Sequence, residues 1–124
     1  FALHPLPNLA LWREVLTFPD RLTFGLSELY KYWEETQAMF TSVLRDYELD
    51  PERSGAGVVL FISHARDALL YGEDLSGHRG QILSAAVGHA VHFHTWRSLV
   101  GKEGLSQTDA VKMMCELILL GRRE

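Results

Sequence analysis

Hydrophobic residues recur between positions 22 and 47 at the spacing of an α-helix. Successive positions are alternately four and three residues apart, and seven of the eight are apolar, so they share one side of a helix. The stripe comprises Leu22, Leu26, Leu29, Trp33, Thr36, Phe40, Val43 and Tyr47. The pattern predicts a long amphipathic helix. We expect Pro19 in its first turn or Asp20 as its cap, and its end at Asp50.

Four more helices are predicted from apolar spacing and from residues that end helices. They are expected over residues 9–16, 51–71, 78–100 and 106–121. No segment alternates apolar and polar residues convincingly with the period of two that marks a half-buried strand. The apolar run 58–62 would also fit a buried strand, but the length of its segment and the residues after it favour a helix. The predicted fold class is all-α, a bundle of about five helices joined by short turns.

Capping residues predict where these helices begin and end. Asp50 is expected to cap the third helix, with Pro51 at its first helical position. Gly72 is expected to end it, because glycine adopts the left-handed conformation without a steric cost. Ser106 is followed three residues later by Asp109, a capping pattern that predicts the start of the last helix.

Size and charge narrow the class of protein. The 124 residues, of which 47% are hydrophobic and 23% charged, predict a single globular domain over residues 1–124. Twelve Lys and Arg against sixteen Asp and Glu give a net charge of −4, which argues against nucleic-acid binding by this segment.

Targeting signals and cysteine content suggest a compartment. The longest apolar run, 58–62, is too short to cross a bilayer, and no secretory signal is visible. The single cysteine, Cys115, fits a reducing compartment, so we expect a cytoplasmic protein. Because the chain begins at Phe1 rather than Met, we expect it to be part of something longer.

Three segments together point to a known family. They read LSELYKYWEETQAMFTSVLRDYELDP, GHAVHFHTWRSLV and GLSQTDAVKMMCELI. The opening of the chain, HPLP followed by a tryptophan and by FPDRL, fits the same pattern. In this order the segments resemble the C-terminal domain of tetracycline-repressor-family (TetR-like) transcriptional regulators. The resemblance covers nearly the whole chain and consists of spacing and residue type, without a catalytic signature.

The resemblance implies a helical domain that binds a small effector and forms a homodimer. In TetR-like repressors and activators, a separate N-terminal domain with a helix-turn-helix binds operator DNA. DNA binding would therefore belong to that missing N-terminal domain. Effector binding would change the separation of two such DNA-binding heads, and so regulate transcription.

The last helix carries more apolar surface than one side of a helix needs. Between residues 110 and 120 only Lys112 and Glu116 are polar, and a helix that is apolar all round must be buried all round. We expect a second copy to cover it, with the last two helices of each subunit forming a four-helix interface and small residues among 85–90 allowing close approach. The alternative is a central helix in a monomeric bundle. The expected interface residues are Ala85, His92, Leu99, Val111, Met114, Cys115 and Ile118.

Aromatic residues with polar ends, such as Tyr30, Tyr32 and Tyr71, are frequent in the chain. Such residues can line an apolar cavity while offering a few hydrogen bonds. We expect the second, third and fourth helices to enclose a cavity for a small hydrophobic effector. The alternative for each lining residue is simple core packing. The predicted lining residues are Trp33, Phe40, Phe61, His64, His89, Phe93 and Trp96.

Six histidines raise the question of a metal site. His89 and His92 are three residues apart and would supply half of a zinc site, with His64 or Cys115 as further ligands. The interpretation that we favour is histidines hydrogen-bonded in the core or at a dimer seam, where they would make an interface sensitive to pH. We therefore predict no metal and no cofactor.

Sequence patterns of catalytic sites are missing. There is no Glu-x-x-His pair, no Gly-x-Ser-x-Gly elbow, and no dinucleotide fingerprint around residues 55–57. Cys115 lies in an apolar helix and is expected to be an inert core residue. We predict that the protein is not an enzyme. The main hypothesis is a ligand-responsive regulatory domain, and the alternative is a helical protein–protein interaction module without a small-molecule ligand.

Overall fold

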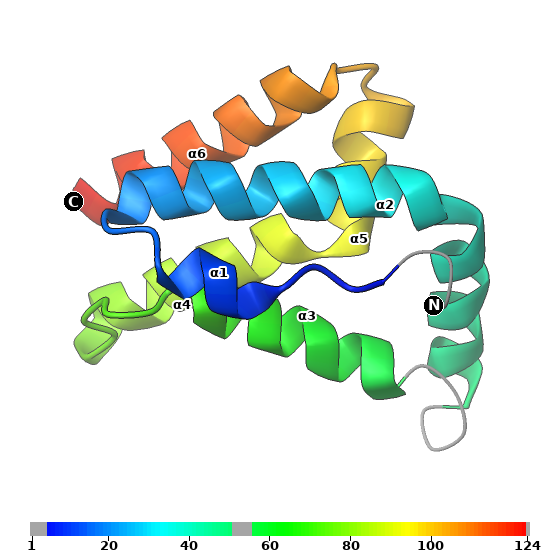
Figure 1. Cartoon of the computed structure of the whole chain (residues 1–124), viewed down its shortest axis with the longest axis horizontal. Helices are drawn as coiled ribbons and strands as arrows, with labels where there is room; N and C mark the ends of the chain where they lie inside the picture. Colours follow the sequence, from blue (N-terminus) through cyan, green and yellow to red (C-terminus); the bar gives the residue numbers. More distant parts are fainter. Residues whose placement is uncertain (1–4, 51–55, 124) are drawn as a thin grey trace.

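A computed structural model describes residues 5–50 and 56–123, and every secondary-structure element in this part of the chain is a helix. The predicted all-α class is therefore confirmed for these residues, whereas the predicted start at Pro51 lies outside them. Figure 1 shows the arrangement. The elements are α1 Leu9–Arg13, α2 Phe18–Leu49, α3 Ala56–Leu69, α4 Gly77–Val91, α5 Phe93–Trp96, the π-helix η1 Arg97–Lys102 and α6 Gln107–Arg123.

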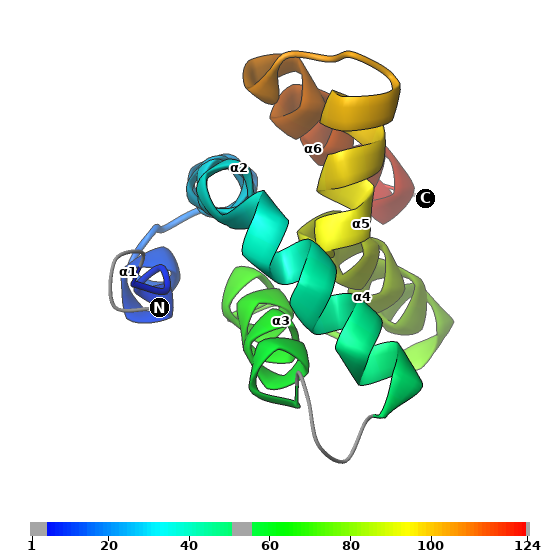
Figure 2. The ribbon, with the colours of Figure 1, turned by 90° about the vertical axis from the view of Figure 1, so that its right-hand side faces the viewer.

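Helix α2 is the longest of these elements and it is bent. Its first half runs beside α6, and its second half turns away (Figures 1 and 2). It begins after Thr17, whose hydroxyl accepts a hydrogen bond from the N–H of Asp20 (3.3 Å). Pro19 lies in the first turn as predicted, but the cap is Thr17 rather than Asp20. Near the middle of the helix the hydroxyl of Thr36 donates to the carbonyl of Tyr32 (2.6 Å), and bonds of this kind bend helices.

Two predicted helix boundaries are confirmed, and a third is displaced. Helix α2 ends at Asp50, whose N–H donates to the carbonyl of Asp46. Helix α3 ends at Leu69, two residues before the predicted Tyr71, and Gly72 in the turn that follows has a φ of 82°, in the left-handed region that favours glycine. The hydroxyl of Ser106 accepts a hydrogen bond from the N–H of Asp109 (3.1 Å) and so caps α6.

The hydrophobic core lies between α2, α3 and α4. Helix α6 packs along the first half of α2 and against α4, while α1 packs against α2 and α3. The approach of α1 and α3 to α2 depends on Gly25, where a Cβ atom would lie 2.5 Å from the side chain of Leu69 and 3.1 Å from the ring of Trp12. The largest fully buried side chains are Trp12, Trp33, Tyr30, Phe40 and Phe93.

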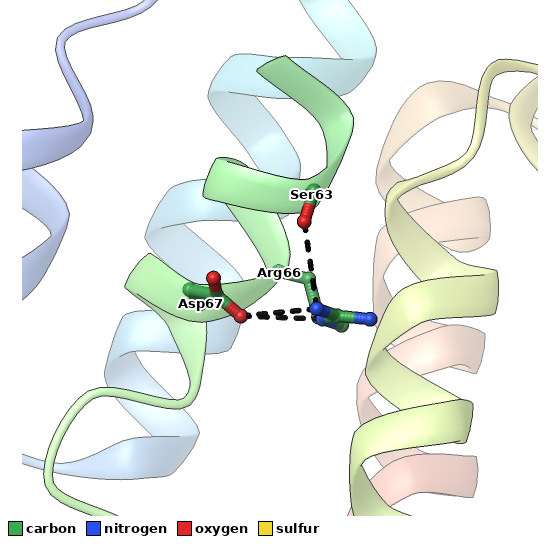
Figure 3. A network of polar contacts seen from close by, with 3 residues as sticks. All are labelled: Ser63, Arg66 and Asp67. Carbon is green, nitrogen blue, oxygen red and sulfur yellow. Dashed lines mark hydrogen bonds and ion pairs between the residues drawn. The ribbon is translucent and has the colours of Figure 1, made fainter. Parts of the chain in front are cut away.

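Helices α3 and α4 approach each other closely at Gly88. A Cβ atom there would lie 3.3 Å from Cδ of Arg66. Figure 3 shows the side chain of Arg66 extending from α3 toward α4. Its guanidinium donates to Asp67 (3.3 Å) and to Ser63 (3.5 Å). Gly88, one of the small residues expected to admit a second subunit, therefore serves packing within the chain.

The predicted helix over 78–100 is not continuous. It breaks at His92, whose backbone is extended (φ −71°, ψ 139°), and resumes as α5 and then η1. Nδ1 of His92 accepts a hydrogen bond from the N–H of His94 (3.1 Å) and caps α5. The hydroxyl of Thr95 donates to the carbonyl of His89 (2.6 Å). Such side-chain bonds compete with the helical ladder, and an apolar pattern does not reveal them.

Helix α2 satisfies the two carbonyls that precede the break. The hydroxyl of Tyr30 donates to the carbonyl of Ala90 (2.6 Å), and the indole N–H of Trp33 donates to that of Val91 (3.3 Å). Both bonds are buried, and burial raises the pKa of Tyr30, which keeps the hydroxyl a donor. Because a buried carbonyl without a partner costs about 1–3 kcal/mol, these two bonds stabilise the break.

Candidate functional site

Five of the seven predicted lining residues lie together at the centre of the molecule. Trp33 and Phe40 come from α2, Phe61 from α3, and Phe93 and Trp96 from α5, and none is more than 7% exposed. The ring of Trp33 meets those of Phe40, Phe61 and Phe93 edge to face, with centroids 4.9, 6.4 and 5.4 Å away. These five residues, the aromatic cluster, pack ring against ring. Contact between them and a ligand remains a prediction.

The other two predicted lining residues, His64 and His89, lie apart from the aromatic cluster. Both are exposed, His64 on α3 and His89 on α4. One helical turn separates His64 from Phe61, and this spacing suggested a shared face. The buried side of α3 instead runs through Phe61, Ala65 and Ala68, which leaves His64 exposed.

Tyr32, which was not among the predicted lining residues, packs against the aromatic cluster. It is 5% exposed, and its ring centroid lies 5.8 Å from that of Trp33, 5.7 Å from Phe40 and 6.4 Å from Phe61. Its hydroxyl is buried and has no hydrogen-bond partner in the described part of the chain. Burial raises the pKa of Tyr32, so the hydroxyl stays protonated near neutral pH. A buried hydroxyl without a hydrogen-bond partner is energetically costly.

A polar link joins the aromatic cluster to α6. The indole N–H of Trp96 donates to Oε1 of Gln107 (2.6 Å). The amide of Gln107 in turn donates to the carbonyl of Tyr30 (2.9 Å) and to the carboxylate of Glu34 (2.7 Å). One side chain at the start of α6 therefore holds both α5 and α2.

The outer sides of α4 and α6 form an exposed apolar surface. The two helices run in opposite directions, since Arg79 near the start of α4 lines one groove with Arg122 near the end of α6, and His89 lines another with Met113. Ile82, Leu117 and Leu120 are 50%, 54% and 57% exposed. We call this surface the α4–α6 face and define it by Ile82, Ala85 and His89 of α4 and Met113, Leu117 and Leu120 of α6.

The α4–α6 face differs from the predicted interface. Val111, Met114, Cys115 and Ile118 are at most 6% exposed, because they pack within their own chain. Of the other predicted residues, Ala85 is exposed on the face, and His92 and Leu99 are half-buried. Helix α6 is thus neither covered on all sides nor apolar all round. The inner side of α6 is buried, and the exposed residues Lys112 and Glu116 occupy a second side. Met113, Leu117 and Leu120 lie on a third side, which belongs to the α4–α6 face.

The thiol of Cys115 is buried in the structure. Burial raises its pKa, which disfavours the nucleophilic thiolate. Its sulfur lies 3.8 Å from the hydroxyl of Thr23, within reach of a weak hydrogen bond.

A groove of about 370 Å³ adjoins the α4–α6 face. Three imidazoles and several apolar side chains meet there, and the rings of His92 and His94 are stacked with centroids 5.0 Å apart. Burial lowers the pKa of His92, as do the neighbouring His94 and His89. The groove is lined by His89, His92, His94, Thr95, Ser98, Leu99, Met113, Met114 and Leu117.

Within 5–50 and 56–123, no group of three or more His, Cys, Asp or Glu residues could hold a metal ion. None of the helices there combines the length and apolar composition that crossing a membrane requires.

Comparisons with protein-family models, curated proteins and solved structures found no match for this chain. The likeness to TetR-like regulators therefore consists of the sequence segments alone.

Proposed function

We propose that the chain is the effector-binding and dimerisation domain of a TetR-like transcriptional regulator, whose DNA-binding domain lies outside these residues. The observation that carries the proposal is the α4–α6 face. On two adjacent helices, three large apolar side chains, Ile82 of α4 and Leu117 and Leu120 of α6, are half exposed or more. Contiguous exposed apolar surface marks interaction sites.

A second copy of the chain is the occupant that this face suits best. Under a two-fold rotation the face of one copy meets the same face of the other, which produces a four-helix arrangement. The small side chain of Ala85 lies between Ile82 and His89 and permits close approach. None of the six defining residues carries a charge when His89 is neutral, so pairing two such faces buries no unpaired charge.

The aromatic cluster and Tyr32 support effector binding. A small apolar molecule with one hydrogen-bonding atom would contact the rings through its apolar part and pair that atom with the Tyr32 hydroxyl. The rings already touch, so binding requires them to separate and favours a different arrangement of α2, α3 and α5. Tyr30 and Trp33 tie α2 to the end of α4, which gives the change a route to the α4–α6 face.

The second candidate is a helical interaction module that takes no small molecule. The ring packing favours it, because the centroids of contacting rings around Trp33 are already only 4.9–6.4 Å apart. In that case the aromatic cluster is core alone, and the α4–α6 face docks a different protein.

Sedimentation equilibrium at micromolar concentration tests self-association. We expect the chain to be a dimer and Leu117→Glu to make it monomeric. The matched control is Leu60→Glu on α3, since Leu60 is 57% exposed and Leu117 54%. A monomeric wild-type chain contradicts the proposal, and so does dissociation of both variants alike.

A thermal-shift screen with a diverse set of small apolar compounds tests effector binding. Compounds that bind the folded chain raise its melting temperature. We expect hits, and we expect Tyr32→Phe to reduce the shift that they cause. If no compound raises the melting temperature, the interaction module is favoured over the effector domain.

A further inference from the structure

A histidine ring caps α5 at the break between α4 and α5. Nδ1 of His92 accepts the N–H of His94 at 3.1 Å, so this nitrogen carries no proton in the folded chain. The neutral ring with its proton on Nε2 meets that requirement. The imidazolium ion does not, because both of its nitrogens are donors. A proton from solvent at Nδ1 therefore removes the cap of α5.

The titratable groups around His92 come from three elements. His89 belongs to α4, and His94 on α5 stacks its ring on that of His92. Glu48 of α2 lies 4.0 Å from Nε2 of His94 and favours protonation of His92, whereas both neighbouring imidazoles oppose it. From η1 and α6 the groove receives only uncharged side chains, such as Ser98 and Met113.

Loss of the cap should affect α5 more than α4, because the end of α4 is held by other contacts. The carbonyls of Ala90 and Val91, just before His92, are held by buried side chains of α2. Beyond His92, the N–H of His94 loses its partner when the ring is protonated. Helix α5 carries Phe93 and Trp96, so any change in its direction reaches the aromatic cluster.

We propose that His92 is a proton-controlled hinge, at which protonation of the ring releases the His94 N–H, changes the angle between α4 and α5 and reshapes the adjoining groove. The hinge itself is independent of the proposed function. Its effect on association rests on that function, because the groove adjoins the α4–α6 face and shares His89, Met113 and Leu117 with it.

Nitrogen NMR of the full chain tests the protonation state directly. Near pH 8 we expect the His92 ring to be neutral with its proton on Nε2. As His92 titrates, we expect the protection of the His94 amide against hydrogen exchange, corrected for the intrinsic rate, to fall on the order of fivefold, the usual effect of losing a cap. A proton on Nδ1 at pH 8, or protection that does not change while His92 titrates, overturns the proposal.

Three variants separate the cap from the charge of the groove. His92→Asn retains a capping side chain that does not titrate, so His94 protection and tryptophan fluorescence should stay constant between about pH 8 and 5. His92→Ala should lack that protection at every pH. The matched control, His94→Asn, keeps the cap and should keep the transition, moved to higher pH because a neighbouring positive charge is gone. A transition that survives in His92→Asn refutes the hinge.

These readouts report on each chain whether or not it associates. A dimer without the transition contradicts only the hinge. A monomer that shows the transition contradicts only the proposed function.

Discussion

Two buried polar side chains in this core differ in how many hydrogen bonds they make. Arg21, 5% exposed, donates through its two terminal nitrogens to the carbonyls of Leu69 (3.3 Å) and Val15 (3.0 Å), and so joins the end of α3 to the turn after α1, while its Nε has no partner among the described residues. Tyr32 is equally buried, yet its hydroxyl has no partner among the residues that the structure describes. Single substitutions at these positions should therefore change stability in opposite directions.

Replacing Tyr32 with Phe should raise the free energy of unfolding by about 1 kcal/mol, because it removes an unpaired hydroxyl and keeps the ring. The comparison is Tyr30→Phe, which loses the 2.6 Å bond to Ala90 and should lower the free energy of unfolding by about 1–3 kcal/mol. Urea denaturation at neutral pH measures both. A less stable Tyr32→Phe variant would mean that the hydroxyl has a partner in solution.

Replacing Arg21 with Met should lower the free energy of unfolding by about 3 kcal/mol, since two carbonyls lose a charged donor. Arg45→Met on the same helix removes an exposed guanidinium and should stay within about 0.5 kcal/mol of wild type. The same denaturation experiment applies. Similar losses in the two variants would show that the bonds of Arg21 contribute little.

At the scale of elements, glycine has different uses in α3 and α4. Gly57 in α3 has open space where a Cβ atom would lie, whereas a Cβ atom at Gly80 would overlap the backbone of Leu75. The first turn of α4 thus folds tightly against the segment that precedes it, and only glycine fits there.

The substitutions Gly57→Ala and Gly80→Ala should consequently have opposite effects. Gly57→Ala should stabilise the chain by about 0.5 kcal/mol, because alanine loses less backbone entropy in a helix. Gly80→Ala should destabilise it by about 2 kcal/mol or more, because backbone atoms must move. The melting temperatures of the two variants, compared with that of the wild-type chain, test both expectations. A Gly80→Ala variant as stable as the wild type would contradict the close contact with Leu75.

The sequence predicts elements that depend on local signals. The stripe from Leu22 to Tyr47 predicts α2, and the Ser106 pattern predicts the start of α6. The break at His92 could not be predicted in this way, because it depends on a ring nitrogen and on hydroxyl bonds to distant carbonyls. The orientation of α6 was also hidden, since leucine and methionine on every side do not show which side faces α2.

The candidate site could be predicted in part, for the same physical reason. Trp33 and Phe40 meet because they share the stripe of α2, and Phe93 joins them from the buried side of α5. Tyr32 is next to Trp33 in the sequence, at the edge of that stripe. Its unpaired hydroxyl follows from three-dimensional packing, which residue spacing does not contain.

At the scale of the whole molecule, His92 makes stability depend on pH. Its pKa in the folded chain lies below its ordinary value of 6.5, so the unfolded chain binds more protons in this range. The contribution of His92 is therefore complete above about pH 6.5 and is lost as the pH falls through that value toward the lowered pKa. Hydrogen bonds from Ser76 lower the pKa of Asp74 below its ordinary value of 3.8. The contribution of Asp74 to stability is therefore lost only below about pH 3.8, in a pH range separate from that of His92.

Unfolding of the chain should accordingly require less urea at pH 5.5 than at pH 8, and the difference should shrink in His92→Asn, which does not titrate there. His78→Asn provides the control, since His78 is exposed at the start of α4. If His92→Asn and His78→Asn reduced the difference between pH 5.5 and pH 8 equally, the pH dependence would come from the overall charge of the chain rather than from the cap.

The central claim is that a second copy of the chain covers the α4–α6 face. Isotope-filtered NMR of mixed labelled and unlabelled chains detects contacts between subunits and no others. The account predicts such contacts among the methyl groups of Ile82, Leu117 and Leu120, and none at Leu60 or Leu16, which are exposed elsewhere. Contacts confined to another surface, or none at micromolar to millimolar concentration, would contradict it.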